Sequence, residues 1–433
     1  MNQIAMFFGE ETRARNMSSI IYEGHYYSNH HPVLLTLYYG LFWKIGEIVG
    51  YVNMAVFALS CLNIMICALC LSFMINRIKS HLSERITTIL IIYMSAWPYF
   101  GAYAYTCCKD NIYAAVLVVF YTLIAEMAIF GEMTGLKDSV LLLLVSVLIP
   151  FLKSQGVLIV VISLVLAAVA NKSIRKKTIG VALISAFLFI VLFSRILMPM
   201  LKISPAGRQE ALSVPFQQTA LLLKQHPESV TDEDYRTIDA VLPADELPEL
   251  YEKGIADGVK FEFDQSSTSE EVREYLKTWA AGFLKHPLVY VRAWSELTDA
   301  YYYMGYDETN IDIYHKLDVY GAFWPDWVVS FEEAENEFFE EMVDFPVLGQ
   351  LLKCSIICWI SLLCLLYLLY LRQFRRALIM MAICLNFFVL LLCPANGYLR
   401  YTLPLIWLVP VGVLLICGKI STMNTAGETT ADK

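Results

Sequence analysis

The chain has 433 residues, of which 58% are hydrophobic and 17% charged, with a net charge of −9 and a mean hydropathy of +0.54. A soluble domain is about 45–50% apolar and about 25% charged, so the composition predicts an all-α integral membrane protein and excludes a water-soluble fold. The charge is uneven: residues 202–347 hold thirty Asp and Glu against eleven Lys and Arg, which leaves the remainder basic. An acidic insert in a basic membrane scaffold excludes nucleic acid as a partner.

Residues 1–51 are predicted to form an outer loop that ends in an interfacial helix. The stretch "YYSNHHPVLL" at 26–35 places His30 and His31 before an apolar run at 33–43, which is short for a bilayer span and suits a helix in the membrane interface. Alternatively, 33–50 crosses the membrane and the N-terminus is cytoplasmic. The opening "MNQIAMFFGEETRARN" lacks a signal-peptide pattern, so the interfacial helix implies a first helix upstream of Met1.

About nine transmembrane helices follow, in an N-terminal bundle at 52–201 and a C-terminal group at 348–418. Most of the apolar segments approach the ~20 residues that cross a ~30 Å hydrocarbon core. They are 52–75, 88–106, 112–131, 138–152, 157–171, 179–201, 348–370, 377–393 and 401–418.

The distribution of Lys and Arg predicts the orientation. Basic residues gather in alternate loops, which the positive-inside rule places in the cytoplasm: 77–85, 137, 172–177 and 372–376. The polar tail 419–433 is then cytoplasmic and expected to be disordered. The insert 202–347 and the short loops around 107–111, 152–156 and 394–400 lie outside the cell.

The extracytoplasmic insert is predicted to be mainly helical. In "SSTSEEVREYLKTWAAGFLKHP", Ser and Thr precede acidic residues and an apolar pattern of helical period, and "TDEDYRTIDAVLP" has the same kind of start. The aromatic-rich stretch after it suits carbohydrate stacking or the membrane interface equally well.

Each short outer loop carries one cation at the membrane edge: Lys109 beside Asp110, Lys153 near Gln155, and Arg400 beside Tyr401. A single such residue is explained by a side chain that reaches lipid headgroups. Three of them on one face suit a lipid-borne phosphate, which charge-assisted hydrogen bonds hold strongly. Asp110 is the candidate to orient Lys109, to bind a divalent metal or to act as a catalytic base.

The residues resemble a family of bacterial polytopic membrane proteins, common in Gram-positive bacteria, that is similar to C-type glycosyltransferases. The resemblance covers nearly the whole chain. It rests on an "NQ" segment, "YSNHHP", "KD" at a helix start, a "K-x-Q-G" turn, "PFQQTA", "ADGVK", "HPLVYVRAW" and "RYTLP".

The resemblance implies transfer of a sugar from a polyprenyl-phosphate donor to a cell-envelope acceptor at the outer face of the plasma membrane. In that class a carboxylate after the first transmembrane helix is the base. "MNQIAMFFG" is similar to the part of the loop that follows it, so the resemblance implies that the base lies upstream of Met1; Glu10, Glu11 and Glu23 do not match its position.

The remaining candidates have binding roles. His30, His31, Lys109, Lys153, Gln155, Arg400 and Tyr401 are the expected ligands of the carrier phosphate or the acceptor. A transporter or flippase of lipid-linked or anionic envelope precursors, and an inactive scaffold, are the alternatives. A transporter is expected to show internal repeats and interrupted helices, which the sequence does not display.

Overall fold

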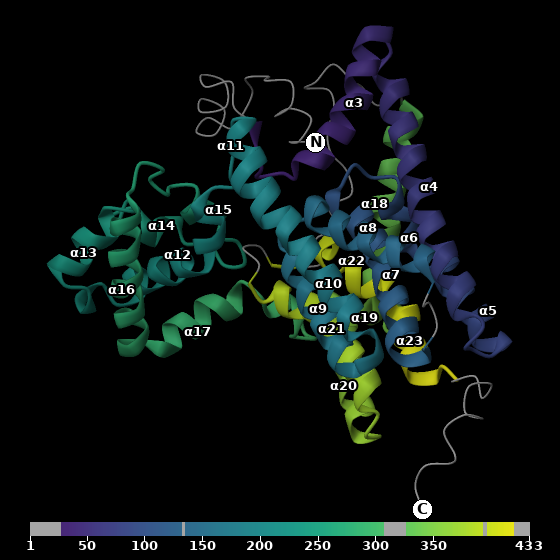
Figure 1. Cartoon of the computed structure of the whole chain (residues 1–433). Coiled ribbons are helices and arrows are strands. Elements are labelled where there is room, and N and C mark those ends of the chain that lie inside the picture. The colour runs from purple at the N-terminus through teal and green to yellow at the C-terminus, as the bar shows by residue number, and fades with distance from the viewer. Residues whose placement is uncertain (1–26, 132–134, 307–325, 393–395, 420–433) are drawn as a thin grey trace, which may run out of the picture.

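The computed structural model describes residues 27–131, 135–306, 326–392 and 396–419 (Figure 1). The predicted all-α class is confirmed: the described residues are largely helical, and their two strands, β1 (Tyr27–Ser28) and β2 (Ile203–Ser204), are two residues long. Three helical stretches in the described part are long and apolar enough to cross a membrane: Val52–Ile78, Lys109–Phe130 and Lys172–Met200. Helices with the length and composition of membrane spans are thus present, and the total of about nine spans stays a prediction.

An N-terminal helical hairpin forms the upper right of Figure 1. It joins α3 (Val33–Val49) to α4 (Val52–Ile78) through Gly50, whose φ of 80° suits glycine. The helices pack closely because Gly46 has no Cβ; a Cβ there would lie 2.9 Å from the Cβ of Ala55. The apolar run at 33–43 therefore continues as a helix to Val49. With 17 residues, α3 is not among the candidate spans.

The helix α7 (Lys109–Ala125) and its π-helical continuation η1 (Glu126–Phe130) form the centre of the bundle. Every residue from Asp110 to Phe130 is buried. α7 packs against α4, α8 (Leu136–Leu152) and α22 (Leu403–Trp407). The first residue of α7, Lys109, therefore lies where several helix ends and loops meet.

The other apolar segments also become helices. The second is broken by Pro98 into α5 (Glu84–Ala96) and α6 (Pro98–Ala104), since proline cannot continue a helix from its predecessor. The rest are α9 (Gly156–Ala170), α10 (Arg175–Ala186) with η3 (Phe187–Leu197) and α11 (Met198–Met200), α19 (Leu348–Leu352), α20 (Cys354–Tyr370), α21 (Phe374–Leu390) and α23 (Val409–Cys417).

The insert packs beside this bundle, on the left of Figure 1, around its own apolar core. Thr231 and Thr268 form capping boxes at the starts of α13 and α16, so both predicted capped helices are confirmed. The insert's helices are α12 (Arg208–Gln225), α13 (Asp232–Asp239), α14 (Leu247–Leu250), α15 (Asp257–Lys260), α16 (Ser269–Lys285) and α17 (Pro287–Glu296).

The last helix before the C-terminal group, α18 (Asp326–Asp344), packs on the bundle instead of on the insert's core. Phe339 stacks on Tyr99 of α6 with ring centroids 5.7 Å apart, and the Tyr105 hydroxyl donates to Glu335 at 2.8 Å. Part of the acidic 202–347 region is therefore attached to the membrane helices.

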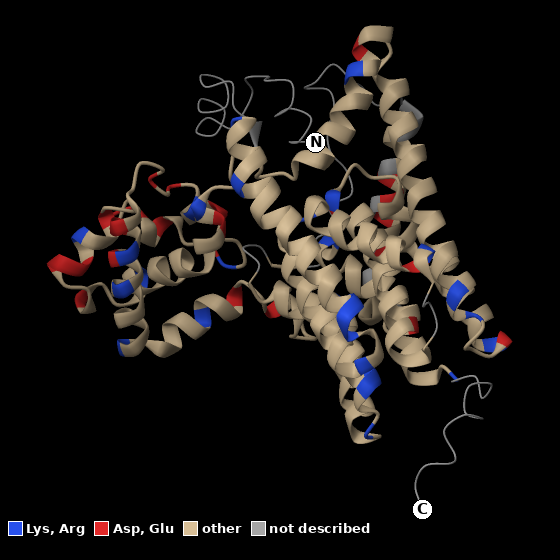
Figure 2. Ribbon diagram, viewed as in Figure 1, with Lys and Arg blue, Asp and Glu red and all other residues tan. Residues whose placement is uncertain are grey.

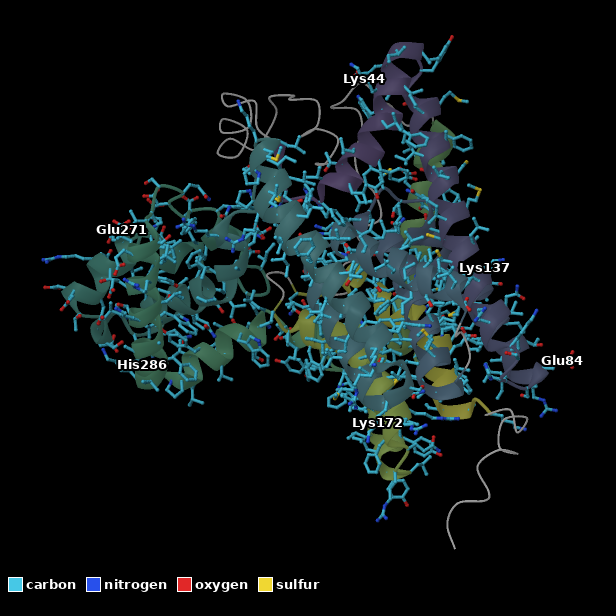
Figure 3. All side chains as sticks on the ribbon, viewed as in Figure 1. Lys44, Glu84, Lys137, Lys172, Glu271 and His286 are labelled. Carbon is cyan, nitrogen blue, oxygen red and sulfur yellow. The ribbon has the colours of Figure 1, made fainter. Side chains whose placement is uncertain are left out.

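Charged residues divide between the two parts of the molecule. Figure 2 shows most of the visible Asp and Glu on the insert, where Lys and Arg are interspersed with them, while further Lys and Arg lie on the bundle helices. In Figure 3, Lys44 lies at the top of the bundle, Lys172 lies at the bottom, and Glu271 and His286 lie on the insert. Glu10, Glu11, Glu23 and the tail from 420 onward lie outside the described residues.

Candidate functional site

An ion pair between two of the short loops, which the sequence predicts to lie outside, forms the centre of the site. The Lys153 ammonium donates to Asp110 Oδ1 at 2.7 Å; the exposed fraction is 13% for the Lys153 side chain and 1% for Asp110. α8 ends at Leu152, Lys153 takes extended backbone, and α9 begins at Gly156, so the turn aims Lys153 at the start of α7. Asp110 was expected to orient Lys109; its hydrogen-bonding partner is Lys153.

Two further cations surround the same carboxylate. Lys109 and Arg400 both interact electrostatically with Asp110, together with Lys153. Arg400 lies in the short 3₁₀ turn η7 (Leu399–Tyr401). The ring of Tyr401 contacts both the Arg400 guanidinium, 5.1 Å from the ring centroid, and the Lys153 ammonium, also at 5.1 Å. Cations from three separate loops therefore converge on one acidic side chain.

Both oxygens of Asp110 have a hydrogen-bonding partner. Its Oδ1 accepts from Lys153, and its Oδ2 accepts from the Cys108 thiol at 3.5 Å. A general base needs an oxygen that reaches the proton it removes. The arrangement of Asp110 suits the positioning of cations better than proton abstraction.

The two histidines adjoin the cluster. Burial lowers the pKa of His31 well below its ordinary value, and the charges of Lys109 and Arg400 add to the effect. Burial also lowers the pKa of His30, against the opposing effect of the Glu210 carboxylate. Both imidazoles are therefore uncharged at neutral pH. Within the described residues, the buried Nδ1 of His31 has no hydrogen-bonding partner.

The "YYSNHHP" stretch also has a structural role. The Asn29 side chain accepts from the Val33 amide at 3.3 Å, and Pro32 precedes the first turn of α3. The backbone of Asn29 donates to Ser204 of the insert at 2.8 Å, next to the β1–β2 pairing. These contacts hold the histidines between the membrane helices and the insert.

The insert contributes residues that sequence reasoning missed. Glu210, in the first turn of α12, lies 3.8 Å from His30 Nδ1 and 3.3 Å from the Lys260 ammonium. Lys260 is buried and also pairs with Asp257 at 2.7 Å. The motif "ADGVK" contains Asp257 and Lys260 and was the available signal; Glu210 is one of thirty acidic residues in the region and nothing local marks it.

One candidate, Gln155, falls outside the cluster, and a further polar residue, Asn396, joins the bundle to the insert. Gln155 has an exposed side chain, and within the described residues no hydrogen bond or ion pair joins that side chain to Asp110. Asn396 bridges the third outer loop to the insert: it accepts from the Ala300 amide at 3.0 Å and donates to the Glu296 carbonyl at 3.2 Å.

The cluster is suited to an anion. Three cations around one carboxylate leave excess positive charge, and the amide groups at the start of a helix as long as α7 favour negative charge as well. Among the described residues, no group of three or more His, Cys, Asp or Glu side chains has the arrangement of a metal site. Binding of phosphate by Lys109, Lys153 and Arg400 stays a prediction.

Comparison with known proteins gives a family without an assigned activity. A model of a family of unknown function, DUF6020, matches residues 22–430. No curated protein matches the chain. No solved structure matches it either. Since the matched residues include both the bundle and the insert, the chain belongs to the DUF6020 family.

Proposed function

We propose that the chain is a multi-pass glycosyltransferase of the bacterial plasma membrane. It transfers a sugar from a polyprenyl-phosphate donor to a cell-envelope acceptor. The insert and the cation cluster face the outside, and the C-terminus is cytoplasmic. The basic loops at 77–85, 172–177 and 372–376 support this orientation. The resemblance to C-type glycosyltransferases supports the reaction.

The observation that carries the proposal is the excess of cations at the ends of apolar helices. Lys109, Lys153 and Arg400 surround Asp110 at the start of α7. A phosphate on a lipid chain has its charge at the same boundary between apolar and polar surroundings. The prenyl chain would lie along the apolar helices, and the sugar would face the insert.

In the reaction, the acceptor oxygen bonds to the anomeric carbon as the bond from that carbon to the phosphate oxygen breaks. The electron pair of the broken bond leaves with the phosphate, and the hydroxyl proton goes to a base. Negative charge grows on the phosphate oxygen, so Lys153 and Arg400 stabilise the transition state more than the ground state.

One observation favours a second candidate, a transporter of lipid-linked or anionic envelope precursors. Both oxygens of Asp110 are engaged, so the cluster can hold a phosphate without a carboxylate base inside it. A transporter binds the lipid phosphate and leaves the sugar attached.

The test uses the purified full chain in lipid nanodiscs. Polyprenyl monophosphate is the probe and polyprenol, which lacks the phosphate, is its matched control. We expect only the phosphate to bind, and Lys153→Met to weaken it at least ~10-fold, the scale of a lost charge-assisted bond. Arg375→Ala, an exposed cation of the 372–376 loop, is expected to leave binding unchanged.

Equal binding of polyprenol and its phosphate would refute the site. Membranes that contain the chain are then given polyprenyl-phosphate hexoses. Release of polyprenyl phosphate with label in the envelope fraction supports the transferase, whereas binding without release supports the transporter.

A further inference from the structure

The transfer proposed above needs a group that accepts the acceptor's proton. Asp110 is engaged at both oxygens, and the other members of its cluster are Lys109, Lys153 and Arg400, which are cationic. The two histidines are uncharged at neutral pH, have a basic nitrogen and interact electrostatically with Lys109 of the cluster.

His30 differs from His31 in its partner. A carboxylate, Glu210, lies 3.8 Å from His30 Nδ1, within ion-pair distance, whereas no carboxylate of the described residues lies within ion-pair distance of His31. A carboxylate on one ring nitrogen orients the imidazole and stabilises the cation that forms when the other nitrogen takes a proton. His30, with Glu210 at ion-pair distance, is therefore the better candidate for a base.

Glu210 is itself held in place. The Lys260 ammonium lies 3.3 Å from its Oε2 and pairs with Asp257 at 2.7 Å. Lys260 is 7% exposed, so this ion pair is poorly screened by water. The strand pairing of Tyr27–Ser28 with Ile203–Ser204 fixes the backbone before His30 against the backbone before α12.

We propose that His30 is the general base of the transfer and that Glu210, supplied by the insert, is its positioning residue. The inference rests on the proposed glycosyl transfer. The acceptor O–H proton moves to Nε2 of His30 as the acceptor oxygen bonds to the anomeric carbon. The bond to phosphate breaks, and its electron pair leaves with the phosphate held by Lys109, Lys153 and Arg400. Glu210 stabilises the imidazolium until the proton passes to water.

The arrangement predicts a dependence on pH. The charged groups around His30 are Glu210 of α12, Lys109 of α7, and Lys260 and Asp257 of α15, with His31 beside it. Glu210 raises the pKa of His30 and the two lysines lower it. Removal of the Glu210 charge therefore moves the His30 titration, and the acid limb of the rate profile, to lower pH.

The experiment compares His30→Gln and Glu210→Gln with a matched control. Glu228→Gln removes a carboxylate that lies 3.2 Å from another histidine, His226, at the far end of α12. Three quantities are measured on the full chain. They are polyprenyl monophosphate binding, kcat for release of polyprenyl phosphate from polyprenyl-phosphate hexose at pH 5–9, and the pH dependence of His30 acylation by diethyl pyrocarbonate, which reacts with uncharged imidazole.

We expect His30→Gln to lower kcat at least ~100-fold and to leave phosphate binding within about twofold. Glu210→Gln should shift both the acid limb and the acylation midpoint to lower pH, and Glu228→Gln should shift neither. If His30→Gln turned over within about twofold of the wild type, or if Glu210→Gln left the acylation midpoint unchanged, the proposed roles of His30 and Glu210 would be wrong. The proposed transferase activity would not be affected by either result. A wild-type chain that binds no polyprenyl phosphate and releases none overturns the transferase and the base together. Retained phosphate binding shows that each variant is folded.

Discussion

The two ends of the central helix differ in the balance of their buried charges. At its start, three cations surround Asp110. At its other end, Arg77 Nε donates to both oxygens of Glu126 at 3.0 Å and its guanidinium lies 3.9 Å from Asp138, so two carboxylates share one cation. Both Asp110 and Glu126 are 1% exposed.

The comparison distinguishes an ion pair that stabilises the fold, Arg77–Glu126, from one that forms part of a candidate binding site, Lys153–Asp110. In the contact at Glu126, Arg77 lies between two carboxylates, which is the arrangement of a structural ion pair. The Asp110 end has two cations beyond the one that its carboxylate neutralises, and it adjoins the polar insert. Both carboxylates are equally buried, so burial does not tell the two ends apart. The excess of positive charge around Asp110 is the feature that suits this end to an anionic ligand.

The largest expected effect is the presence or absence of cysteine labelling, which tests whether the Asp110 end of the bundle faces the outside of the cell. In a background without cysteine, Glu233→Cys in the insert should react with a membrane-impermeant maleimide on intact cells, because the insert is expected outside. Lys176→Cys should react only after lysis. Labelling of Lys176→Cys, but not of Glu233→Cys, on intact cells would show that the orientation is the opposite of the predicted one.

Arg77→Ala tests the closed end. It leaves Glu126 buried without its main cation and should lower stability by about 3–5 kcal/mol, the cost of breaking a buried pair. Thermal denaturation in detergent gives the measurement, with Arg375→Ala as the exposed control. Adding Glu126→Gln to Arg77→Ala should recover much of the loss, since no buried charge then remains unpaired; an unchanged midpoint in Arg77→Ala would contradict the structural role.

Arg400→Ala tests the cationic end. It should reduce sugar transfer at least ~100-fold, the scale for removal of one transition-state charge stabiliser. Stability should change far less than in Arg77→Ala, because Asp110 keeps its bond to Lys153. Turnover assays and denaturation of the same preparation give both values. If Arg400→Ala lowered stability as much as Arg77→Ala and left sugar transfer unchanged, Arg400 would have a structural role like that of Arg77, and the distinction between the two ends would be wrong.

The smallest effect concerns the insert alone. Thr268→Ala removes the N-cap of α16 and should lower the insert's stability by about 1 kcal/mol. Polyprenyl monophosphate binding should be unaffected, since α16 contributes no residue to the cation cluster. Hydrogen exchange of the α16 amides measures the stability of the insert. A loss of phosphate binding in Thr268→Ala would show that the cation cluster depends on the whole insert.

The positions of the helices could be predicted from local sequence, because each depends on nearby residues. A chain in lipid must satisfy its backbone hydrogen bonds within the segment, so the apolar segments become helices. Pro98 breaks one of them, and Thr231 and Thr268 begin two others through their own side chains. The extension of α3 to Val49 was missed because Lys44 and Glu47 interrupt the apolar run, although they pair with each other on the helix at 2.9 Å.

The sequence by itself determined the helical class, the acidic insert and a cation in each of three short loops between apolar segments. Only the tertiary structure decided which of these side chains meet. Lys109, Lys153 and Arg400 converge because helix packing brings three distant loops to the start of α7, whereas Gln155, two residues from Lys153, faces away. Glu210 reaches His30 across the junction between insert and bundle. Contacts between residues far apart in the chain depend on how whole helices pack, and no local pattern of residue types specifies that packing.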